Sequence, residues 1–442
     1  NVAVGSRTLD ANTTGSTNTG CGEQSLSSNT TGGSNTAVGQ GALFANTTAS
    51  NNTAVGKDSL VANTTASDNT AVGKEALAAN TTGGSNVAVG NETLEANTTG
   101  ASNTAVGALA LDANTTGTNN TGIGYNALSD NTTGIHNTGL GDLALNQNTT
   151  ASNNTAVGYK CLEANTTGTG NTALGTHALD SNTTASHITA IGFETLQANT
   201  TGTNNTAVGA YALDANTTGA ANVAVGDGAI GTNTTSNYNT GVGHFALNAN
   251  TAAYNTAVGA NALRANTTGW GNTAAGYLAG TAITTAWGCT TIGNDCGKNI
   301  TTGEDCTIVG HSAGVGITTG HRNTLIGVSA GDVITTGGNN ICVGFDVDPS
   351  SATVSNTITL GNGSISTLRC NQTSISSLSD KRDKTDIVDI PVGLKFLNTL
   401  RPVKFKWQRR EPDATDGTVR AGFIAQELQT AQGDNDYLDL IM

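Results

Sequence analysis

Residues 35–51 read Asn-Thr-Ala-Val-Gly-Gln-Gly-Ala-Leu-Phe-Ala-Asn-Thr-Thr-Ala-Ser-Asn, and nearly the same seventeen residues return at 52, 69, 86 and 103. The step stays at seventeen up to the unit that begins at 239, which is one residue short. Later units begin at 255, 272, 289, 306 and 323. A short fixed period predicts a solenoid, in which each unit is one coil stacked on the last. Positions are numbered 1–17 from the first Asn of each unit.

The residue types within a unit predict short strands and turns. Thr-Ala-Val-Gly at positions 2–5 alternates as a strand does, and we expect the Val at position 4 to point inward. The Ala-Leu pair at positions 8 and 9 is too short for a helix and predicts a second strand or strand-like corner. Asn-Thr-Thr-Gly at positions 12–15 is turn chemistry, because Asn and Gly tolerate left-handed backbone. The sequence therefore predicts an all-β fold, a parallel β-solenoid or β-roll of about twenty-one coils.

Composition and charge exclude several classes of function. Residues 1–355 hold seven basic and twenty-one acidic side chains, and nucleic-acid binding needs clustered Lys and Arg. No stretch reaches the ~20 apolar residues of a membrane span, so membrane insertion is not expected. The six histidines show no metal-ligand spacing. The acidic residues that recur at position 10 lack the second carboxylate that glycan cleavage needs. We therefore expect no metal, no cofactor and no turnover enzyme.

The thin core that each coil can build predicts self-association. One coil is expected to bury one Val, one Leu and a few Ala methyls, and cores of this size usually need help from oligomerisation. We expect a homotrimer that buries one face of the solenoid and leaves positions 6, 7, 10, 16 and 17 outside. Tyr254, Trp270 and Trp287 are expected to form one exposed stripe at position 16. That stripe suits either sugar recognition or packing between protomers.

Changes of composition divide the chain into three parts. Residues 1–339 form the repeat shaft, 340–378 an irregular capping coil and linker, and 379–442 a separate module of mixed α and β character. The first proline is Pro349, and Lys, Arg, Asp and aromatic residues gather after residue 379. The chain starts in phase with a coil and without an initiator Met. We therefore expect an N-terminal anchor, and the last part of the C-terminal module, to lie outside this sequence.

The C-terminal module carries three motifs in a specific order: Ser379-Asp-Lys-Arg-Asp-Lys384, Leu400-Arg-Pro-Val-Lys-Phe-Lys-Trp407 and Ala421-Gly-Phe-Ile-Ala-Gln-Glu-Leu428. It resembles the self-cleaving intramolecular chaperone domain of phage endosialidases, tail fibres and neck appendages. The resemblance implies that Ser379 is the nucleophile and Lys384 the general base of a single-turnover Ser–Lys autopeptidase. The bond cut would be Leu378–Ser379. Asp383 would hold Lys384 protonated and slow this reaction.

The repeat is similar to a second family. Asn-Thr-Ala-Val-Gly resembles the core motif of trimeric autotransporter adhesin heads, which are β-rolls assembled as trimers. Together the two resemblances imply an elongated viral or phage tail fibre or appendage that attaches to a host-surface glycan or receptor. The alternative is a bacterial surface adhesin or a glycosylated extracellular fibril. A minor alternative is an ice-binding solenoid with arrays of Thr.

Two repeated residue types leave alternatives open. Asn-Thr-Thr fits the glycosylation pattern, and the same residues suit stacked ladders of side chains. Cys289 and Cys306 share a position one coil apart, which predicts stacked buried thiols or a bridge. The fifteen candidate glycosylation sites are Asn12, Asn29, Asn46, Asn63, Asn80, Asn97, Asn114, Asn131, Asn148, Asn165, Asn182, Asn199, Asn216, Asn233 and Asn266.

Overall fold

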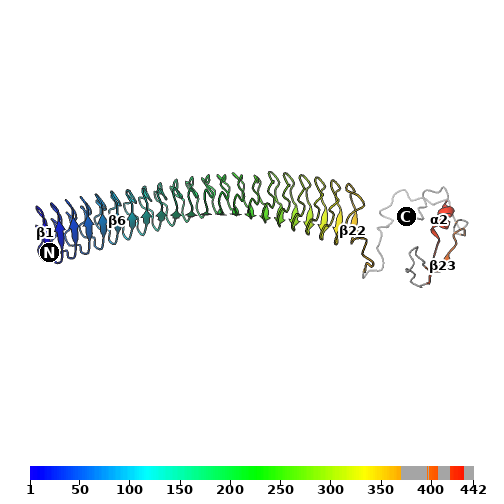
Figure 1. The fold of residues 1–442 in the computed structure, drawn as a ribbon, viewed down its shortest axis with the longest axis horizontal. Coiled ribbons are helices and arrows are strands. Elements are labelled where there is room, and N and C mark those ends of the chain that lie inside the picture. The colour runs from blue at the N-terminus through cyan, green and yellow to red at the C-terminus, as the bar shows by residue number, and fades with distance from the viewer. Residues whose placement is uncertain (370–395, 397, 407–418, 433–442) are drawn as a thin grey trace, which may run out of the picture. The chain divides into compact units, whose positions relative to one another are not determined.

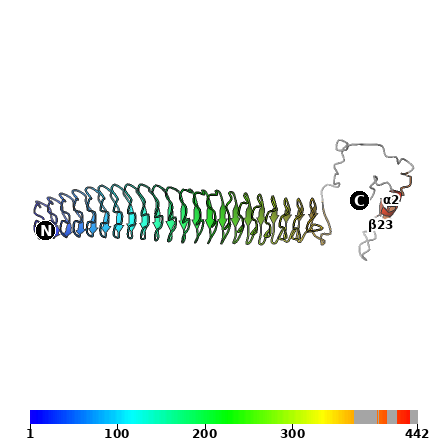
Figure 2. The same ribbon diagram turned by 90° about the horizontal axis from the view of Figure 1, so that it is seen from above.

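Each repeat folds into one coil, and the coils stack along a single axis (Figures 1 and 2). This computed structural model describes residues 1–369, 396, 398–406 and 419–432. It divides into two units, Asn1–Ser366 and Thr367–Met442. The first unit is the coil stack and the second contains the C-terminal module. Figure 1 shows the strands of successive coils side by side along one flank of the stack.

One strand from each coil enters a single 22-stranded sheet. Every strand in it has three residues, at positions 2–4 of its coil. The strands are β1 (Val2–Val4), β2 (Thr19–Cys21), β3 (Thr36–Val38), β4 (Thr53–Val55), β5 (Thr70–Val72), β6 (Val87–Val89), β7 (Thr104–Val106), β8 (Thr121–Ile123), β9 (Thr138–Leu140), β10 (Thr155–Val157), β11 (Thr172–Leu174), β12 (Thr189–Ile191), β13 (Thr206–Val208), β14 (Val223–Val225), β15 (Thr240–Val242), β16 (Thr256–Val258), β17 (Thr273–Ala275), β18 (Thr290–Ile292), β19 (Thr307–Val309), β20 (Thr324–Ile326), β21 (Ile341–Val343) and β22 (Ile358–Leu360).

The pairing register follows the repeat. Each strand pairs in parallel with the strand of the next coil, so Thr36 lies opposite Thr53 and Val38 opposite Val55. The one shorter step joins Thr240 to Thr256 and marks the short unit at 239. Pairing continues through β21 and β22, past the first proline. The predicted all-β parallel β-solenoid with about seventeen residues per coil is confirmed.

The prediction of a second strand in each coil is wrong for the described coils. Positions 6–11 form turns, and the Leu at position 9 has left-handed backbone, with φ between 49° and 57°. Left-handed backbone costs an ordinary L-residue about 1–2 kcal/mol. Here it aims the side chain into the coil, where Leu43 and its copies from Leu26 to Leu263 are fully buried. Burial of a Leu is worth about 1.5–3 kcal/mol, which offsets the strain.

The prediction that position 4 points inward is also wrong. In β3 the buried residue is Ala37, and Val38 is 37% exposed. The same pattern holds from β2 to β21, where position 3 is buried and position 4 faces out. The core of a coil therefore consists of the small residue at position 3, Ala at position 8, Leu at position 9 and the Asn residues at positions 1 and 12. No Val contributes to it in the regular coils.

From residue 272 onward the coil core is rebuilt. Position 9 becomes Gly and position 12 becomes a fully buried Ile, as in Gly280 and Ile283. A Cβ added at Gly280 would lie 2.9 Å from the Cδ1 atom of Ile283. The Gly is therefore needed to make room for the Ile, and the bulk of the core moves from position 9 to position 12.

The described part of the C-terminal module is small. Strands β23 (Val403–Lys406) and β24 (Val419–Gly422) form an antiparallel pair. Helix α2 (Ala425–Gln432) follows β24 directly. The module thus has the mixed α and β character that its composition predicts.

Candidate functional site

The outward side of the 22-stranded sheet is an uncharged surface, on which a mainly apolar row of side chains runs beside a row made mostly of Thr. It consists of the side chains at positions 2 and 4 of β1–β22, which we call the strand face. Position 2 is Thr, Val or Ile, and position 4 is Val, Ile or Leu except at Cys21 and Ala275. None of these side chains is buried, and Leu174 is 46% exposed.

Charged side chains avoid the strand face. No Asp, Glu, Lys, Arg or His stands at positions 2, 3 or 4 of β1–β22. All seven basic and twenty-one acidic residues of 1–355 lie elsewhere in their coils. Since the other turns of the coil accept charge freely, this distribution marks the strand face as distinct from the rest of the surface.

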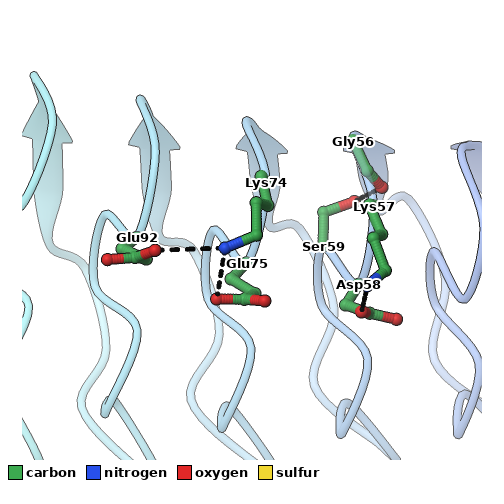
Figure 3. Close-up of polar contacts among 7 residues, drawn as sticks. All are labelled: Gly56, Lys57, Asp58, Ser59, Lys74, Glu75 and Glu92. Atoms are coloured by element: carbon green, nitrogen blue, oxygen red, sulfur yellow. Dashed lines mark hydrogen bonds and ion pairs between the residues drawn. The ribbon is translucent and has the colours of Figure 1, made fainter.

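The charged groups form ion pairs along a ridge at positions 6, 7 and 10 (Figure 3). The Lys74 ammonium lies 3.1 Å from the carboxylate of Glu75 and 3.2 Å from that of Glu92 in the next coil. Hydrogen bonds to these two carboxylates raise the pKa of Lys74. Lys57 and Asp58 form a similar pair at 3.5 Å. These exposed pairs add little stability and describe a solvated surface.

Two asparagine ladders run through the interior. At position 12, the Nδ2 atom of Asn46 donates to Oδ1 of Asn29 (2.8 Å) and to the carbonyl of Ala49 (3.1 Å). At position 1, Asn35 donates from Nδ2 to the same Ala49 carbonyl (2.8 Å) and accepts from the backbone N–H of Asn52 (3.0 Å). The ladders therefore join neighbouring coils and close each coil on itself. This confirms the ladder interpretation of the Asn-Thr-Thr repeat.

The hydrogen bonds of the position-12 ladder also decide whether its Asn side chains are accessible to glycosylation. A glycan is attached at Nδ2 of Asn, and in the position-12 ladder this atom donates hydrogen bonds inside the coil. The candidate sites Asn29 to Asn266 are fully buried, and Asn12 in the first coil is half-buried. A sugar at these positions would require the coil to open. We therefore expect the mass of the folded chain to be unchanged by deglycosylation.

Cysteines replace Asn at position 1 of two late coils. The Cys289 thiol donates to the Gly303 carbonyl at 3.2 Å, and the Cys306 thiol to the Gly320 carbonyl at 3.5 Å. Each thiol reaches the carbonyl at position 15 to which Asn donates in other coils. Both cysteines are free thiols in the structure. A hydrogen bond to Cys306, together with burial, raises the pKa of Cys289. The pair thus forms a ladder of buried thiols.

The aromatic residues of the predicted stripe form two short stacks instead of one stripe. Tyr254 lies on Tyr238, with ring centroids 5.4 Å apart and planes inclined by 10°. Trp270 lies on Trp287 at 5.5 Å and 4°. The predicted single stripe is wrong because the short unit at 239 moves Tyr254 to the left-handed position 17, above Tyr238. Each ring in these stacks covers only one face of its partner.

The structure brings together two of the three C-terminal motifs. Strand pairing places Val403 opposite Gly422. The Arg401 guanidinium makes two hydrogen bonds to the Glu427 carboxylate, which raise the pKa of Arg401 and lower that of Glu427. Phe423 and Ile424 remain partly exposed beside this pair. The second and third motifs of the sequence therefore correspond to one contact region between a strand pair and a helix start.

The predicted catalytic residues lie outside the described residues. These are Ser379, Lys384 and the Leu378–Ser379 bond, together with Asp383. Within the part of the chain that the structure describes, no three His, Cys, Asp or Glu side chains gather as metal ligands would. No helix among the described residues is long and apolar enough to cross a membrane.

Comparison with known proteins supports the resemblance at the C-terminus. Residues 379–437 match the family model described as chaperone of endosialidase. The match begins at Ser379, the residue for which the resemblance implies a nucleophile. No curated protein and no solved structure matches the chain. The C-terminal module is therefore similar to an endosialidase-type chaperone, and the solenoid and this module together fit a fibre-like structural protein.

Proposed function

We propose that this chain is the shaft of a homotrimeric viral fibre of the phage tail-fibre or appendage type, which attaches a particle to a host surface. One observation carries the proposal. A solenoid of uniform coils is followed in the same chain by a segment that matches an intramolecular chaperone. Its partners would be two further copies of the chain and a host-surface glycan or receptor.

The way in which a long parallel sheet forms would explain the need for an assembly module. Parallel pairings between coils are local in this fold, but each coil buries only one large side chain, so the nucleus of the stack is weak. A module that gathers copies and starts the stack in register would remove that kinetic difficulty. Once the stack has formed, the module could be released by cleavage at Leu378–Ser379.

The oligomeric state of the full chain tests this proposal. Sedimentation or native mass spectrometry is expected to give three chains per particle. A particle of one chain at micromolar concentration would overturn the trimeric fibre.

Cleavage is tested separately with Ser379→Ala. The wild-type chain is expected to yield fragments that end at Leu378 and begin at Ser379, and the variant to remain whole. If both chains give the same products, Ser379 has no catalytic role, and the fibre proposal rests on the solenoid and its assembly alone.

A further inference from the structure

The strand face is an unpartnered and uncharged surface that extends over the whole coil stack, with an apolar row at position 4 beside a row made mostly of Thr at position 2. In a single coil the exposed Val at position 4 would be unremarkable, since isolated apolar residues are common on protein surfaces. Here such residues recur in 22 successive strands at the same position. With about 4.8 Å between strands and about 10 Å per three-residue strand, the face covers roughly 1,000 Å².

We propose that the strand face is the surface through which copies of this chain pack against one another. This inference rests on the proposed function and adds to it the surface that the copies use. Residues such as Val72, Leu140 and Ile326, each close to 40% exposed, would meet their equivalents in neighbouring copies.

Charge and area both favour another copy of this chain as the partner of the strand face. Charged residues are depleted from the cores of protein interfaces, and none occurs at positions 2–4 of the 22 strands. An interface of standard size buries about 800 Å² on each partner, which the strand face can supply. The Lys74–Glu75–Glu92 ridge begins beside the strands and would form the polar rim.

The repeat itself points to a copy of the same chain. A partner that covers the entire face must present apolar groups at the spacing of the coils, one group for every strand. It must also follow the gradual turn of the strands about the stack axis that Figures 1 and 2 show. Another copy has this spacing and this turn by construction. The outward Thr at position 2 would supply hydroxyl groups along the border of the contact.

Cysteine protection tests the proposal in the full-length chain. Leu174→Cys places a thiol on the strand face, and Thr184→Cys places one at the exposed position 14 of the same coil. Both variants are made in a Cys21→Ser background, because Cys21 is itself an exposed strand-face thiol. We expect maleimide to modify position 184 at least about tenfold faster than position 174, read by peptide mass spectrometry. After unfolding in denaturant the two rates should become equal.

Equal labelling in an assembled, folded sample would overturn the strand-face interface and leave the proposed fibre intact. Equal labelling in a sample that sediments as one chain would overturn both proposals. The two failures are therefore distinguishable.

A second measurement uses lysine substitutions and does not depend on a single site. Leu140→Lys, Leu174→Lys and Val258→Lys together place three charges on the strand face. The matched control carries Thr150→Lys, Thr184→Lys and Thr268→Lys at position 14 of the same coils. The strand-face variant is expected to keep its β circular dichroism while the Cys21 thiol becomes reactive. The control variant is expected to behave as the wild-type chain does. Unchanged protection of Cys21 in the strand-face variant would contradict the proposal. The proposal would also be contradicted if single chains bound ice and only the strand-face variant lost that activity.

Discussion

At the scale of single residues, the buried asparagines hold the coils together more specifically than the apolar side chains do. Leu at position 9 supplies hydrophobic burial, but it would tolerate a small slip between coils. The amides do not, because each has fixed donors and acceptors in its own coil and in the next. Asn131 donates to Asn114 (2.8 Å) and Gly134 (3.2 Å) and accepts from Asn148 (2.9 Å).

Asn131→Ala is expected to lower the free energy of unfolding by about 2–4 kcal/mol, because Asn114, Gly134 and Asn148 each lose one buried hydrogen bond. Thermal unfolding followed by circular dichroism measures this loss. Thr133→Ala, at the exposed position 14 of the same coil, is the control and should change the stability little. Equal effects of the two substitutions would show that the ladder has no special role.

The partly buried carboxylate of Asp112 should make the stability of the folded chain depend on pH with a definite sign. Partial burial of the Asp112 side chain raises the pKa of this group in the folded state. The folded chain therefore binds this proton more readily than the unfolded chain, and stability rises as the pH falls through the folded pKa. Asp112→Asn should raise the melting temperature at pH 7, and the gain should vanish near pH 3, below the ordinary Asp pKa of about 3.9. Asp68→Asn, which removes a charge from an exposed side chain in another coil, should not reproduce this pattern.

At the scale of the coil, the turn after the strand sets the strictest requirement. Position 5 is Gly in every coil that contributes a strand to the sheet, with φ between about 130° and 145° in most of them. A Cβ on Gly141 would lie 2.5 Å from the carbonyl oxygen of Gly158 in the next coil. Only Gly allows this backbone and this close approach together.

Gly141→Ala is expected to cost at least about 2–3 kcal/mol, as strained backbone at this φ does. Gly84→Ala is the matched control, because a Cβ added there would come no closer than 3.1 Å to a neighbouring group and position 16 of the next coil holds Ala101. Comparison of the two midpoints in urea measures the difference. A control variant as unstable as Gly141→Ala would show that any added methyl group disrupts the stack.

The change of core at residue 272 predicts coupling between positions 9 and 12. Asn266→Ile alone should overpack the coil against Leu263, and Leu263→Gly alone should leave a cavity. The double variant recreates the pairing of Gly280 with Ile283 in the next coil. Its loss of stability should therefore be smaller than the sum of the single losses by at least about 1 kcal/mol. A double-mutant cycle measures this term, and strict additivity would contradict the paired design of the two positions.

At the scale of the whole molecule, the stack is a one-dimensional array in which each coil contacts its neighbours. Opening is then easiest at the ends and hardest in the interior. Burial raises the pKa of Cys161, in the middle of the stack, to about 12, as it does for Cys296. Cys21 lies exposed near the N-terminal end.

Cys161 and Cys296 are expected to react with iodoacetamide at pH 8 at least about 100-fold more slowly than an exposed thiol, since the reactive species is the thiolate. Their rates should approach that of a free thiol only when the stack opens. Timed alkylation and peptide mass spectrometry measure both rates. Rapid modification of Cys161 in the folded protein would show that the middle of the stack opens freely.

The sequence by itself determined the period, the parallel register, the short coil at 239 and the existence of the C-terminal module. The period and the register follow from the spacing of the repeats, because equivalent residues of stacked coils must lie opposite each other. It did not determine which side of the strand is the core. Ala37 and Val38 point in opposite directions, and a three-residue strand fits either phase, since a shift by one residue exchanges its faces. The tertiary structure decided for Ala at position 3, because the inward Leu at position 9 and two asparagine amides leave room only for a small residue beside them.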